Sequence, residues 1–396
     1  MIKQLILNPV ENLPNLITNN SFENIQGLYV SDKLKTDDIV KSSIIGFSGR
    51  MKENEDVRRI YSEWKDAIGV ENLSMRLLSG LHAHTVLFMG LGSIGDKVMI
   101  LPIEAGGHFS TKIILERLGY NVIEAVPDCD NLAVDFEKTL ALIRKEKPKF
   151  VFIDRSEGIY YEDYTELINS INEDCGTMFD ASQYLTNIMM KDFKSPFEMG
   201  FHLMMSTLHK NFPGPQKAMV CSKVNNTYWE KALYAVNNYV SNIHVEPIYL
   251  AGDILSKKEL LSDYSKKMLQ NSIHLELSMN NLGMPVVLKD SKRTPTHHIW
   301  INFNNKDTAF DFYKKMEQCG FLVNYRKLPY NLGFGIRMGT SAATLQGIND
   351  SNQKDLADLI FKIYETENIN ERIIGDCQDF ICSLSPLSKS IGDSHE

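Results

Sequence analysis

A lysine and an aspartate in this chain stand where each could take part in covalent chemistry. Lys210 follows an apolar run at residues 201–205 and precedes a turn that contains Pro213 and Gly214. A lysine that is desolvated at a strand end can lose its proton and attack a carbonyl to form a Schiff base. Asp180 ends another apolar run, and a carboxylate there can keep the ring nitrogen of pyridoxal phosphate protonated. The two residues together predict a pyridoxal phosphate site, although such a lysine alone is more often a plain strand-end charge.

Two glycine-containing turns fit the same cofactor. Ser79 and Gly80 precede a helix-like run, and the backbone N–H groups at a helix N-terminus bind phosphate. Gly106 and Gly107 precede His108, whose imidazole has room to stack on an aromatic ring. The alternatives are a plain helix cap at Ser79 and an ordinary loop histidine at position 108.

An arginine near the C-terminal end of the chain has the chemistry to bind a substrate. Arg337 lies between Gly335 and Gly339. Its planar guanidinium can bind a carboxylate through two parallel hydrogen bonds. The alternative is an arginine on an exposed strand.

Apolar runs and amphipathic segments alternate along the middle of the chain and would position these residues. We expect strands at residues 97–102, 121–126, 150–154, 177–180, 203–207 and 217–221. We expect helices at residues 112–118, 136–145 and 162–171. This alternation predicts an α/β fold with a mostly parallel sheet that is covered by helices on both faces. Ligands bind at the carboxyl ends of such strands, where Asp180 and Lys210 fall.

The chain divides into three predicted parts. Residues 1–45 form an N-terminal arm without a sheet pattern of its own, and residues 46–260 form the large, cofactor-binding domain. Residues 261–396 form a smaller α+β C-terminal domain. We expect a helical connector at residues 228–282 that leads into the small domain. Within that domain we expect a strand at residues 298–303, a helix at 308–319 and a final helix at 355–368.

Composition fits a cytoplasmic enzyme. The 396 residues are 43% hydrophobic and 23% charged, which is ordinary for a globular protein with ample core. The net charge of −8 gives no basic field that would attract nucleic acid or an anionic membrane. Six cysteines without a metal-type CxxC pair favour reduced thiols in a cytosol. Neither a signal-peptide pattern nor a membrane-spanning apolar run is found.

The order of these motifs resembles serine hydroxymethyltransferase and its relatives, in fold type I of the pyridoxal phosphate enzymes. The resemblance extends over roughly residues 7–344. The matching pieces are Leu7-Asn8-Pro9-Val10-Glu11-Asn12, Ser79-Gly80, Gly106-Gly107-His108, Asp180-Ala181-Ser182-Gln183, Thr207-Leu208-His209-Lys210 with Gly214-Pro215, Thr296-His297-His298 and Gly335-Ile336-Arg337-Met338-Gly339-Thr340.

The resemblance implies a role for each matched position. Lys210 would hold the cofactor, Asp180 would contact the ring nitrogen and His108 would stack on the ring. The other cofactor-binding positions would be Ser79 and Gly80 at the phosphate, Ser156 or Gln183 near the ring hydroxyl, and Thr207 and His209 beside the lysine. The substrate positions would be Arg337, Glu11 and Asn12, with Tyr29 in proton handling. The family also implies a homodimer.

Several positions depart from the family pattern. Ser31 stands where the family has a glutamate used in proton handling and folate chemistry, and Asp32 is shorter and displaced by one position. Gln183 replaces a histidine, and Gln216 replaces an arginine. The Gly-Gly pair with which a neighbouring subunit completes the phosphate site has no clear match in residues 241–247.

The sequence therefore predicts a pyridoxal phosphate enzyme that acts at Cα of a small amino acid. The favoured reaction makes or breaks the Cα–Cβ bond of a β-hydroxy amino acid of the glycine, serine or threonine type, with an aldehyde as the other partner. Ser31 leaves the use of tetrahydrofolate open, so a folate-independent aldolase or transaldolase stands beside a true hydroxymethyltransferase. The alternatives are an aminotransferase, a decarboxylase, or a relative that binds the cofactor without catalysis.

Overall fold

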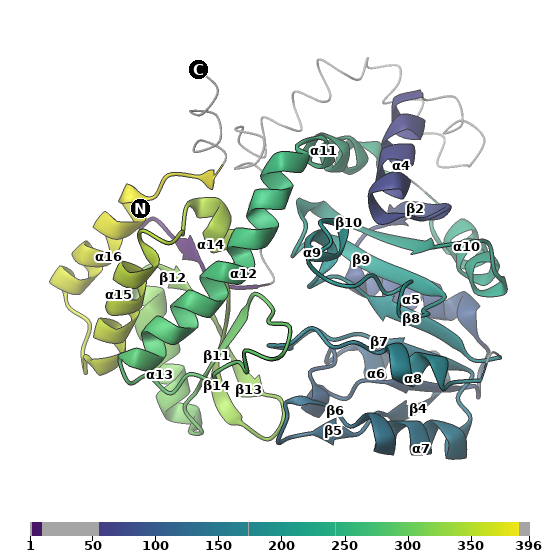
Figure 1. Ribbon diagram of the computed structural model, residues 1–396, viewed down its shortest axis with the longest axis horizontal. Coiled ribbons are helices and arrows are strands. Elements are labelled where there is room, and N and C mark those ends of the chain that lie inside the picture. The colour runs from purple at the N-terminus through teal and green to yellow at the C-terminus, as the bar shows by residue number, and fades with distance from the viewer. Residues whose placement is uncertain (1, 10–54, 173, 242, 388–396) are drawn as a thin grey trace.

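The computed structural model describes residues 2–9, 55–172, 174–241 and 243–387. The predicted positions Tyr29, Glu11 and Asn12, together with Ser31 and Asp32, lie outside these residues. Figure 1 shows two parts side by side: a large sheet with its helices, and a smaller part that holds both ends of the described chain.

The large part is built on a seven-stranded sheet. Its strands, in spatial order, are β2 (Asn72–Leu77), β10 (Pro213–Ser222), β9 (Leu203–His209), β8 (Gly176–Asp180), β7 (Phe150–Ile153), β3 (Lys97–Ile100) and β4 (Asn121–Glu124). The strands from β9 to β4 pair in parallel, and β10 runs antiparallel to both of its neighbours. Only β10 runs against the direction that the other strands of this sheet share, so the predicted mostly parallel α/β sheet is confirmed.

Helices cover both faces of this sheet (Figure 1). One face packs against α5 (Gly80–Leu91), α6 (Thr111–Arg117) and α10 (Thr227–Tyr239). The other packs against α4 (Glu55–Ile68), α7 (Phe136–Glu146), α8 (Thr165–Asn169), α9 (Leu185–Met189) and α11 (Val245–Ser256). A short 3-10 turn, η3 (Ile103–Ala105), and a hairpin of β5 (Pro127–Asp128) and β6 (Ala133–Val134) follow β3 and β4.

Strand β7 explains why the expected strands read as continuous apolar runs. Phe150 and Phe152 join the core on the α5 face, while Val151 and Ile153 join the core on the α4 face. Successive side chains point to opposite faces of a sheet, so a strand that is buried on both faces needs apolar residues at every position.

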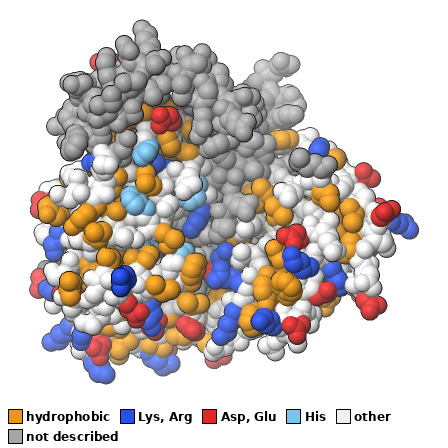
Figure 2. Space-filling view, turned by 180° about the vertical axis from the view of Figure 1, so that it is seen from behind, with side chains coloured by type: hydrophobic (Ala, Val, Ile, Leu, Met, Phe, Trp, Pro, Cys, Tyr) orange, Lys and Arg blue, Asp and Glu red, His pale blue; other side chains and the backbone are white. Residues whose placement is uncertain are grey.

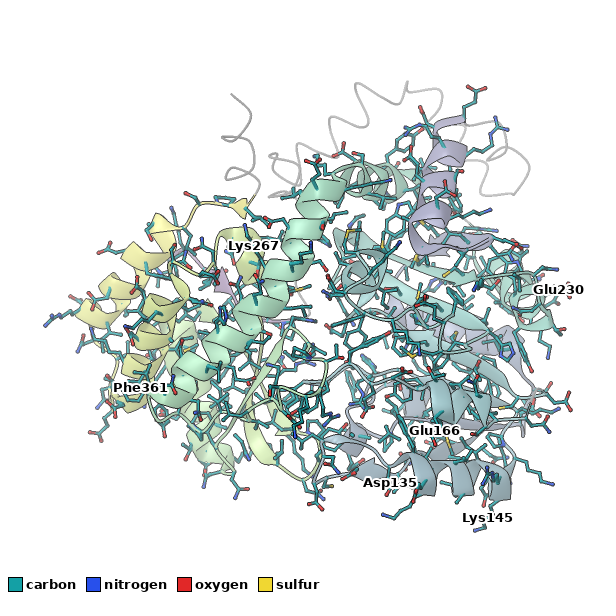
Figure 3. All side chains as sticks on the ribbon, in the orientation of Figure 1. Asp135, Lys145, Glu166, Glu230, Lys267 and Phe361 are labelled. Atoms are coloured by element: carbon teal, nitrogen blue, oxygen red, sulfur yellow. The ribbon has the colours of Figure 1, made fainter. Side chains whose placement is uncertain are left out.

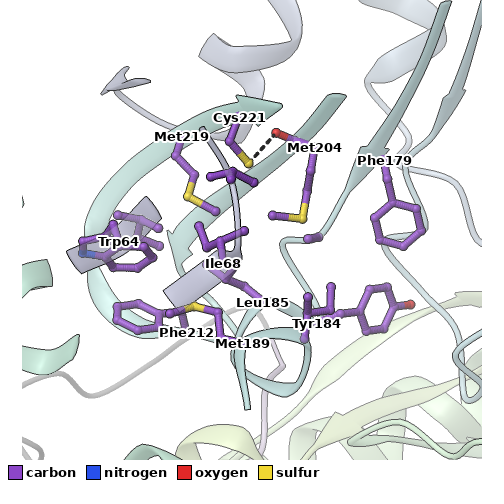
Figure 4. Packing of buried hydrophobic residues seen from close by; sticks show 14 of the residues in the cluster. Trp64, Ile68, Phe179, Tyr184, Leu185, Met189, Met204, Phe212, Met219 and Cys221 are labelled. Atoms are coloured by element: carbon purple, nitrogen blue, oxygen red, sulfur yellow. Dashed lines mark hydrogen bonds between the residues drawn. The ribbon is translucent and has the colours of Figure 1, made fainter. Parts of the chain in front are cut away.

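The core on the α4 face is aromatic and rich in methionine (Figure 4). Trp64 from α4 packs edge-on against Phe212, with ring centroids 4.9 Å apart. The Cys221 thiol donates to the Met204 carbonyl, with an Sγ–O distance of 3.5 Å. This packing fixes the chain immediately after Lys210. Charged side chains of the covering helices, such as Lys145 and Glu230, instead point away into solvent (Figure 3).

The smaller part contains two sheets and several helices. The three-stranded antiparallel sheet has the order β11 (His298–Asn302), β14 (Gly333–Gly339), β13 (Asn324–Leu328). The helices are α13 (Lys306–Gln318), α14 (Ser341–Gln346), α15 (Gln353–Glu365) and α16 (Glu371–Ser383).

Helix α12 (Lys258–Asn281) connects the two parts. Leu260 and Met268 from its first half join the core of the large part, and Leu275 and Met279 join the core of the small part. The predicted domain boundaries after residues 45 and 260 stay predictions, and the second of them falls inside this helix.

Two expectations for the ends of the chain were wrong. The arm does take part in a sheet, because β1 (Leu5–Ile6) pairs in parallel with β12 (Phe321–Leu322). Leu5 N donates to the Gly320 carbonyl at 2.9 Å, which ties the start of the chain to the small part. The helix expected as the last one is α15, and α16 follows it. Two apolar residues are too short a run to stand out as a strand in a sequence, since strands are usually recognised from four or more.

Candidate active site

Asp180 and Lys210 lie at the carboxyl ends of neighbouring parallel strands. Asp180 is the last residue of β8, and Lys210 directly follows β9, which pairs with β8. Burial lowers the pKa of the Lys210 ammonium; the positive charge of Arg337 lowers it further, and the Asp180 carboxylate opposes the shift. This lysine is therefore easier to deprotonate than a surface lysine, which is the property that nucleophilic attack on a carbonyl requires.

Both oxygens of Asp180 are anchored. Oδ1 accepts hydrogen bonds from the Ser182 backbone N–H at 2.8 Å and from the Ser182 hydroxyl at 2.5 Å. Oδ2 lies 3.1 Å from Nε2 of His84. Burial raises the pKa of this carboxyl, but the His84 contact, the charge of Lys210 and the Ser182 bond outweigh it, so the pKa of Asp180 lies below its usual value. The side chain is held as an oriented carboxylate.

A buried polar chain continues behind His84. Nδ1 of His84 lies 3.3 Å from the Thr111 hydroxyl, and this hydroxyl donates to Oδ2 of Asp154 at 2.5 Å. Burial raises the pKa of Asp154 well above its usual range, so this carboxyl favours its neutral form. The chain links Asp180 at the end of β8 to Asp154, the residue after β7, through two helices, α5 and α6.

His108 lies next to this chain. Its ring meets the His84 ring edge-on, with centroids 5.9 Å apart, and stacks on Phe109 at 4.8 Å. Burial lowers the pKa of His108 to about 3, helped by the positive charges of His84 and Lys210. The imidazole is therefore neutral near pH 7, as suits a flat ring that covers another aromatic system.

The N-terminus of α5 lies beside the strand that carries the lysine. Ser79 caps the helix, its Oγ accepting from the His82 backbone N–H at 3.3 Å. A Cβ atom added at Gly80 would lie 3.0 Å from Cγ2 of Thr207. The Thr207 hydroxyl is buried and has no hydrogen-bond partner among the described residues. The Thr207 side chain lies beside Gly80 at a helix N-terminus and carries a free hydroxyl, a combination that fits a phosphate group.

Arg337 reaches this region from the small part. It lies on β14, is 3% exposed, and neither its Nε nor its Nη1 has a hydrogen-bond partner among the described residues. Nη1 lies 3.8 Å from Oε1 of Glu157. Burial lowers the pKa of Arg337 to about 10, although Glu157 opposes the shift. Because a buried guanidinium with free N–H groups is costly, the arrangement fits a carboxylate ligand.

Three other predicted positions make different contacts. The Ser156 backbone N–H donates to the Gly106 carbonyl at 2.9 Å, so Ser156 lies beside the glycines that precede His108. Gln183 Oε1 contacts Nε2 of His298 at 3.3 Å, directed to the small part. His209 Nδ1 accepts from the Lys217 backbone N–H at 3.3 Å, and burial lowers the pKa of His209 to about 4.

The sequence interpretation missed His84 and Ser182 as contacts of the aspartate. His84 is buried at 2% exposure on a helix face whose neighbours Ala83, Val86 and Leu87 are apolar. A histidine inside an apolar helical stripe needs a buried partner, and that signal was present in the sequence. Nothing in the sequence indicated that the partner was Asp180, which lies 96 residues away.

These features suit pyridoxal phosphate: an anchored carboxylate for the ring nitrogen, a lysine with a lowered pKa, and an unpartnered hydroxyl beside a helix N-terminus. With the mostly parallel sheet they define a pyridoxal phosphate enzyme of fold type I.

Comparison with known proteins gives the family. The serine hydroxymethyltransferase family pattern matches residues 58–360. Serine hydroxymethyltransferase of Methanobrevibacter smithii is 27% identical over 382 residues, which cover 89% of this chain and 90% of that protein. The protein of the same description from Saccharolobus islandicus is 27% identical over 350 residues, covering 82% and 81%. The chain belongs to the serine hydroxymethyltransferase family.

A solved structure supports the fold. The chain is similar to L-threonine transaldolase from Pseudomonas fluorescens, whose crystal structure is of the internal aldimine state. The TM-score is 0.84 at 20% identity, and the match covers 98% of this chain and 88% of that one. At this identity the likeness supports the fold type, and the family membership together with that fold makes the protein a pyridoxal phosphate-dependent enzyme of the aldolase or transferase type.

Proposed function

We propose that this enzyme makes or breaks the Cα–Cβ bond of a small β-hydroxy amino acid, with serine or threonine as the substrate type. The observation that carries the proposal is the position of Lys210, which follows the strand next to the one that Asp180 ends and is close enough to Arg337 for the two charges to interact. It brings a cofactor-type lysine, a ring-nitrogen carboxylate and a carboxylate-binding guanidinium into one site. A small amino acid offers one carboxylate for the guanidinium and one amine for the cofactor.

The proposed roles follow from the contacts. Lys210 holds the cofactor covalently through Nζ, and Asp180 holds a proton at the ring nitrogen because its own pKa is lowered. Pyridoxal phosphate, when bound, supplies an electron sink for negative charge at Cα. Arg337 binds and orients the substrate carboxylate. Neutral His108 covers the ring and excludes water from one side of it.

The phosphate end is proposed to lie at the N-terminus of α5. Ser79, Gly80 and Thr207 would contact the phosphate, which the helix dipole and the free Thr207 hydroxyl favour. Ser156, Gln183 and His209 are proposed as nearby cofactor contacts. Glu11, Asn12 and Tyr29 remain proposed substrate and proton-handling residues on the strength of the family pattern.

A separate question is whether the enzyme uses tetrahydrofolate. Hydroxymethyl transfer through folate needs a placed acid or base, which typically contributes about 10²–10⁴-fold to the rate. Ser31 stands where the family has glutamate, and serine has no useful pKa near neutrality. We propose that cleavage proceeds without tetrahydrofolate, as an aldolase or transaldolase with an aldehyde as the second partner. The likeness to the transaldolase fold is compatible with this proposal, and a true hydroxymethyltransferase is the alternative.

One assay tests both the proposed cleavage reaction and its independence of tetrahydrofolate. The purified, cofactor-loaded protein is incubated with glycine, serine and threonine, with and without tetrahydrofolate and with a set of aldehydes, and amino-acid products are measured. Product formation from threonine or serine without tetrahydrofolate is the expected result. A stimulation by tetrahydrofolate of roughly 100-fold or more, the size of one acid–base group, would show that the glutamate has been functionally replaced. No turnover of any β-hydroxy amino acid would contradict the proposed reaction.

We also propose that the protein is a homodimer. Large apolar side chains are exposed on α5 (Leu81 and Met89), on α6 (Ile113) and just before α6 (Phe109). Figure 2 shows many hydrophobic side chains exposed on the side of the molecule opposite to the view of Figure 1. Large apolar side chains exposed on two neighbouring helices are typical of interaction sites. Light scattering should give twice the chain mass, and Met89→Glu with Ile113→Glu should lower it to a single chain.

A reducing compartment fits the cysteines. All six are unpaired, and four of them are buried. This supports the proposal of a cytoplasmic enzyme, since disulfides are rare in the cytosol. Separately, among the described residues there is no helix that has both the length and the apolar character to cross a bilayer.

A further inference from the structure

A buried carboxylate lies between two guanidinium groups at the substrate side of the site. Glu157 forms an ion pair with Arg326 through Oε1, and the same oxygen lies 3.8 Å from Nη1 of Arg337. Glu157 is 3% exposed, and its second oxygen, Oε2, has no hydrogen-bond partner among the described residues. A buried carboxylate left half satisfied is costly, so its position calls for a function.

The three groups come from both parts of the molecule. Arg326 on β13 and Arg337 on β14 project from the same face of the three-stranded sheet, because Asn324 pairs with Arg337 and Arg326 lies two residues further along its strand. That face also carries Trp300, which packs with Ile159 of the large part. Glu157 therefore meets both arginines across the boundary between the two parts.

The backbone of Glu157 is fixed in this position. Its N–H donates to the Gly106 carbonyl at 2.9 Å. Gly106 has a φ of +80°, and a Cβ atom there would lie 1.9 Å from the Glu157 carbonyl oxygen. The backbone of the loop after β7 is thus held against the glycine pair that precedes His108, which places Glu157 beside the segment proposed to cover the cofactor ring.

Arg326 lies within electrostatic range of the proposed cofactor ring. Its positive charge contributes to the low pKa of His108, after burial and the charges of His84 and Lys210. It also acts on the pKa of Arg337, which burial lowers first. A second guanidinium therefore lies close to both His108 and Arg337, and Glu157 forms an ion pair with it.

We propose that Glu157 restricts the enzyme to amino acids with a single carboxylate, by holding the second guanidinium, Arg326, that would otherwise receive a side-chain carboxylate. The inference rests on the proposed role of Arg337 as the group that binds the α-carboxylate. Two arginines and one glutamate carry one net positive charge, which one substrate carboxylate neutralises. A second substrate carboxylate would face Glu157 and be repelled, which is specificity through an unfavourable contact.

The test compares L-aspartate with L-asparagine, which have nearly the same shape and differ in side-chain charge. Binding is measured from the change in the visible absorbance of the bound cofactor, without turnover. The unaltered enzyme should bind asparagine more tightly than aspartate. In Glu157→Gln the ratio of aspartate to asparagine affinity should rise by roughly tenfold or more, the size of one charged hydrogen bond. Glu157→Asp, which keeps the charge, should retain the original preference.

Arg326 provides the matched control. Adding Arg326→Gln to Glu157→Gln should remove the gain for aspartate. Arg326→Gln alone, with Glu157 intact, should leave aspartate excluded. Where Glu157→Gln fails to fold, the preference of the unaltered enzyme for asparagine over aspartate still tests the idea. Aspartate binding as tightly as asparagine in the unaltered enzyme, or an unchanged ratio in folded Glu157→Gln, would overturn the inference.

The outcomes separate the inference from the proposed function. Loss of serine binding in Arg337→Ala, combined with an unchanged aspartate ratio in Glu157→Gln, leaves the proposed function standing and rejects the role of Glu157. Unchanged serine binding in Arg337→Ala rejects the role of Arg337 on which both depend.

Discussion

Nε2 of His84 lies 3.1 Å from Oδ2 of Asp180, and His84 is only 2% exposed. The two residues come from a helix and a strand that are 96 residues apart. This contact, rather than the lysine alone, keeps the carboxylate charged in a buried site, because the His84 hydrogen bond and charge are the largest effects that oppose burial. In the proposed site, the proton at the ring nitrogen would therefore depend on His84 through its contact with Asp180.

We expect His84→Leu to weaken cofactor binding. Removing the partner leaves Oδ2 of Asp180 buried without its hydrogen bond, at a cost of about 1.5–3 kcal/mol for a bond to a charged group. The measurement is the cofactor dissociation constant from titration of the visible absorbance. His84→Asn, which keeps a donor on a short side chain, should recover part of the loss. Equal binding by His84→Leu and the unaltered enzyme would mean that Asp180 does not depend on His84.

Lys210 should carry the cofactor. Borohydride reduction of the loaded enzyme should fix a pyridoxyl group on the peptide that contains Lys210, because its lowered pKa makes it the nucleophilic lysine of the site. Mass spectrometry of the digest locates the label. Lys217 is a close control, since burial lowers its pKa to about 7 but its Nζ donates to the backbone carbonyl of Ile243. A label on Lys217, or on any other lysine, would refute the assignment.

Arg337 should matter for the substrate and not for the cofactor. Arg337→Ala should keep the visible absorbance of the bound cofactor and weaken amino-acid binding by about 2–4 kcal/mol, the range for removing one partner of a desolvated charged pair. The dissociation constants of serine and glycine give the measurement. Arg293→Ala is the matched control, because Arg293 stacks on Tyr160 at 3.6 Å and is partly exposed. A similar loss in both variants would indicate a general effect on folding.

The sequence was sufficient to predict features that follow from the order of strands and helices along the chain. Asp180 and Lys210 end apolar runs, and parallel strands bring their carboxyl ends to one edge, so their proximity followed from the pattern alone. It was insufficient where contacts join distant segments. The partners of Asp180 and of Arg337 are His84 and Glu157, and no periodicity relates these positions. Strand β1 was missed for the same reason: its partner, β12, lies over 300 residues away.

Buried neutral histidines should make stability depend on pH. His297 is fully buried, neither ring nitrogen has a hydrogen-bond partner among the described residues, and burial lowers its pKa from 6.5 to about 3. Between these two values the unfolded chain binds a proton that the folded chain does not. The free energy of unfolding therefore falls as the pH is lowered from 6.5 towards 3, by about 1.4 kcal/mol per pH unit for this residue.

The variant His297→Asn isolates this effect. It removes the titrating group, so the slope of unfolding free energy against pH between 6.5 and 4.5 should be shallower than that of the unaltered enzyme by about 1.4 kcal/mol per pH unit. Urea denaturation at several pH values gives both slopes. The variant loses some stability at every pH because a smaller side chain replaces a packed ring, but that offset does not change with pH. Parallel curves for the two proteins would show that His297 is protonated to the same extent in the folded and unfolded chains, against the burial argument.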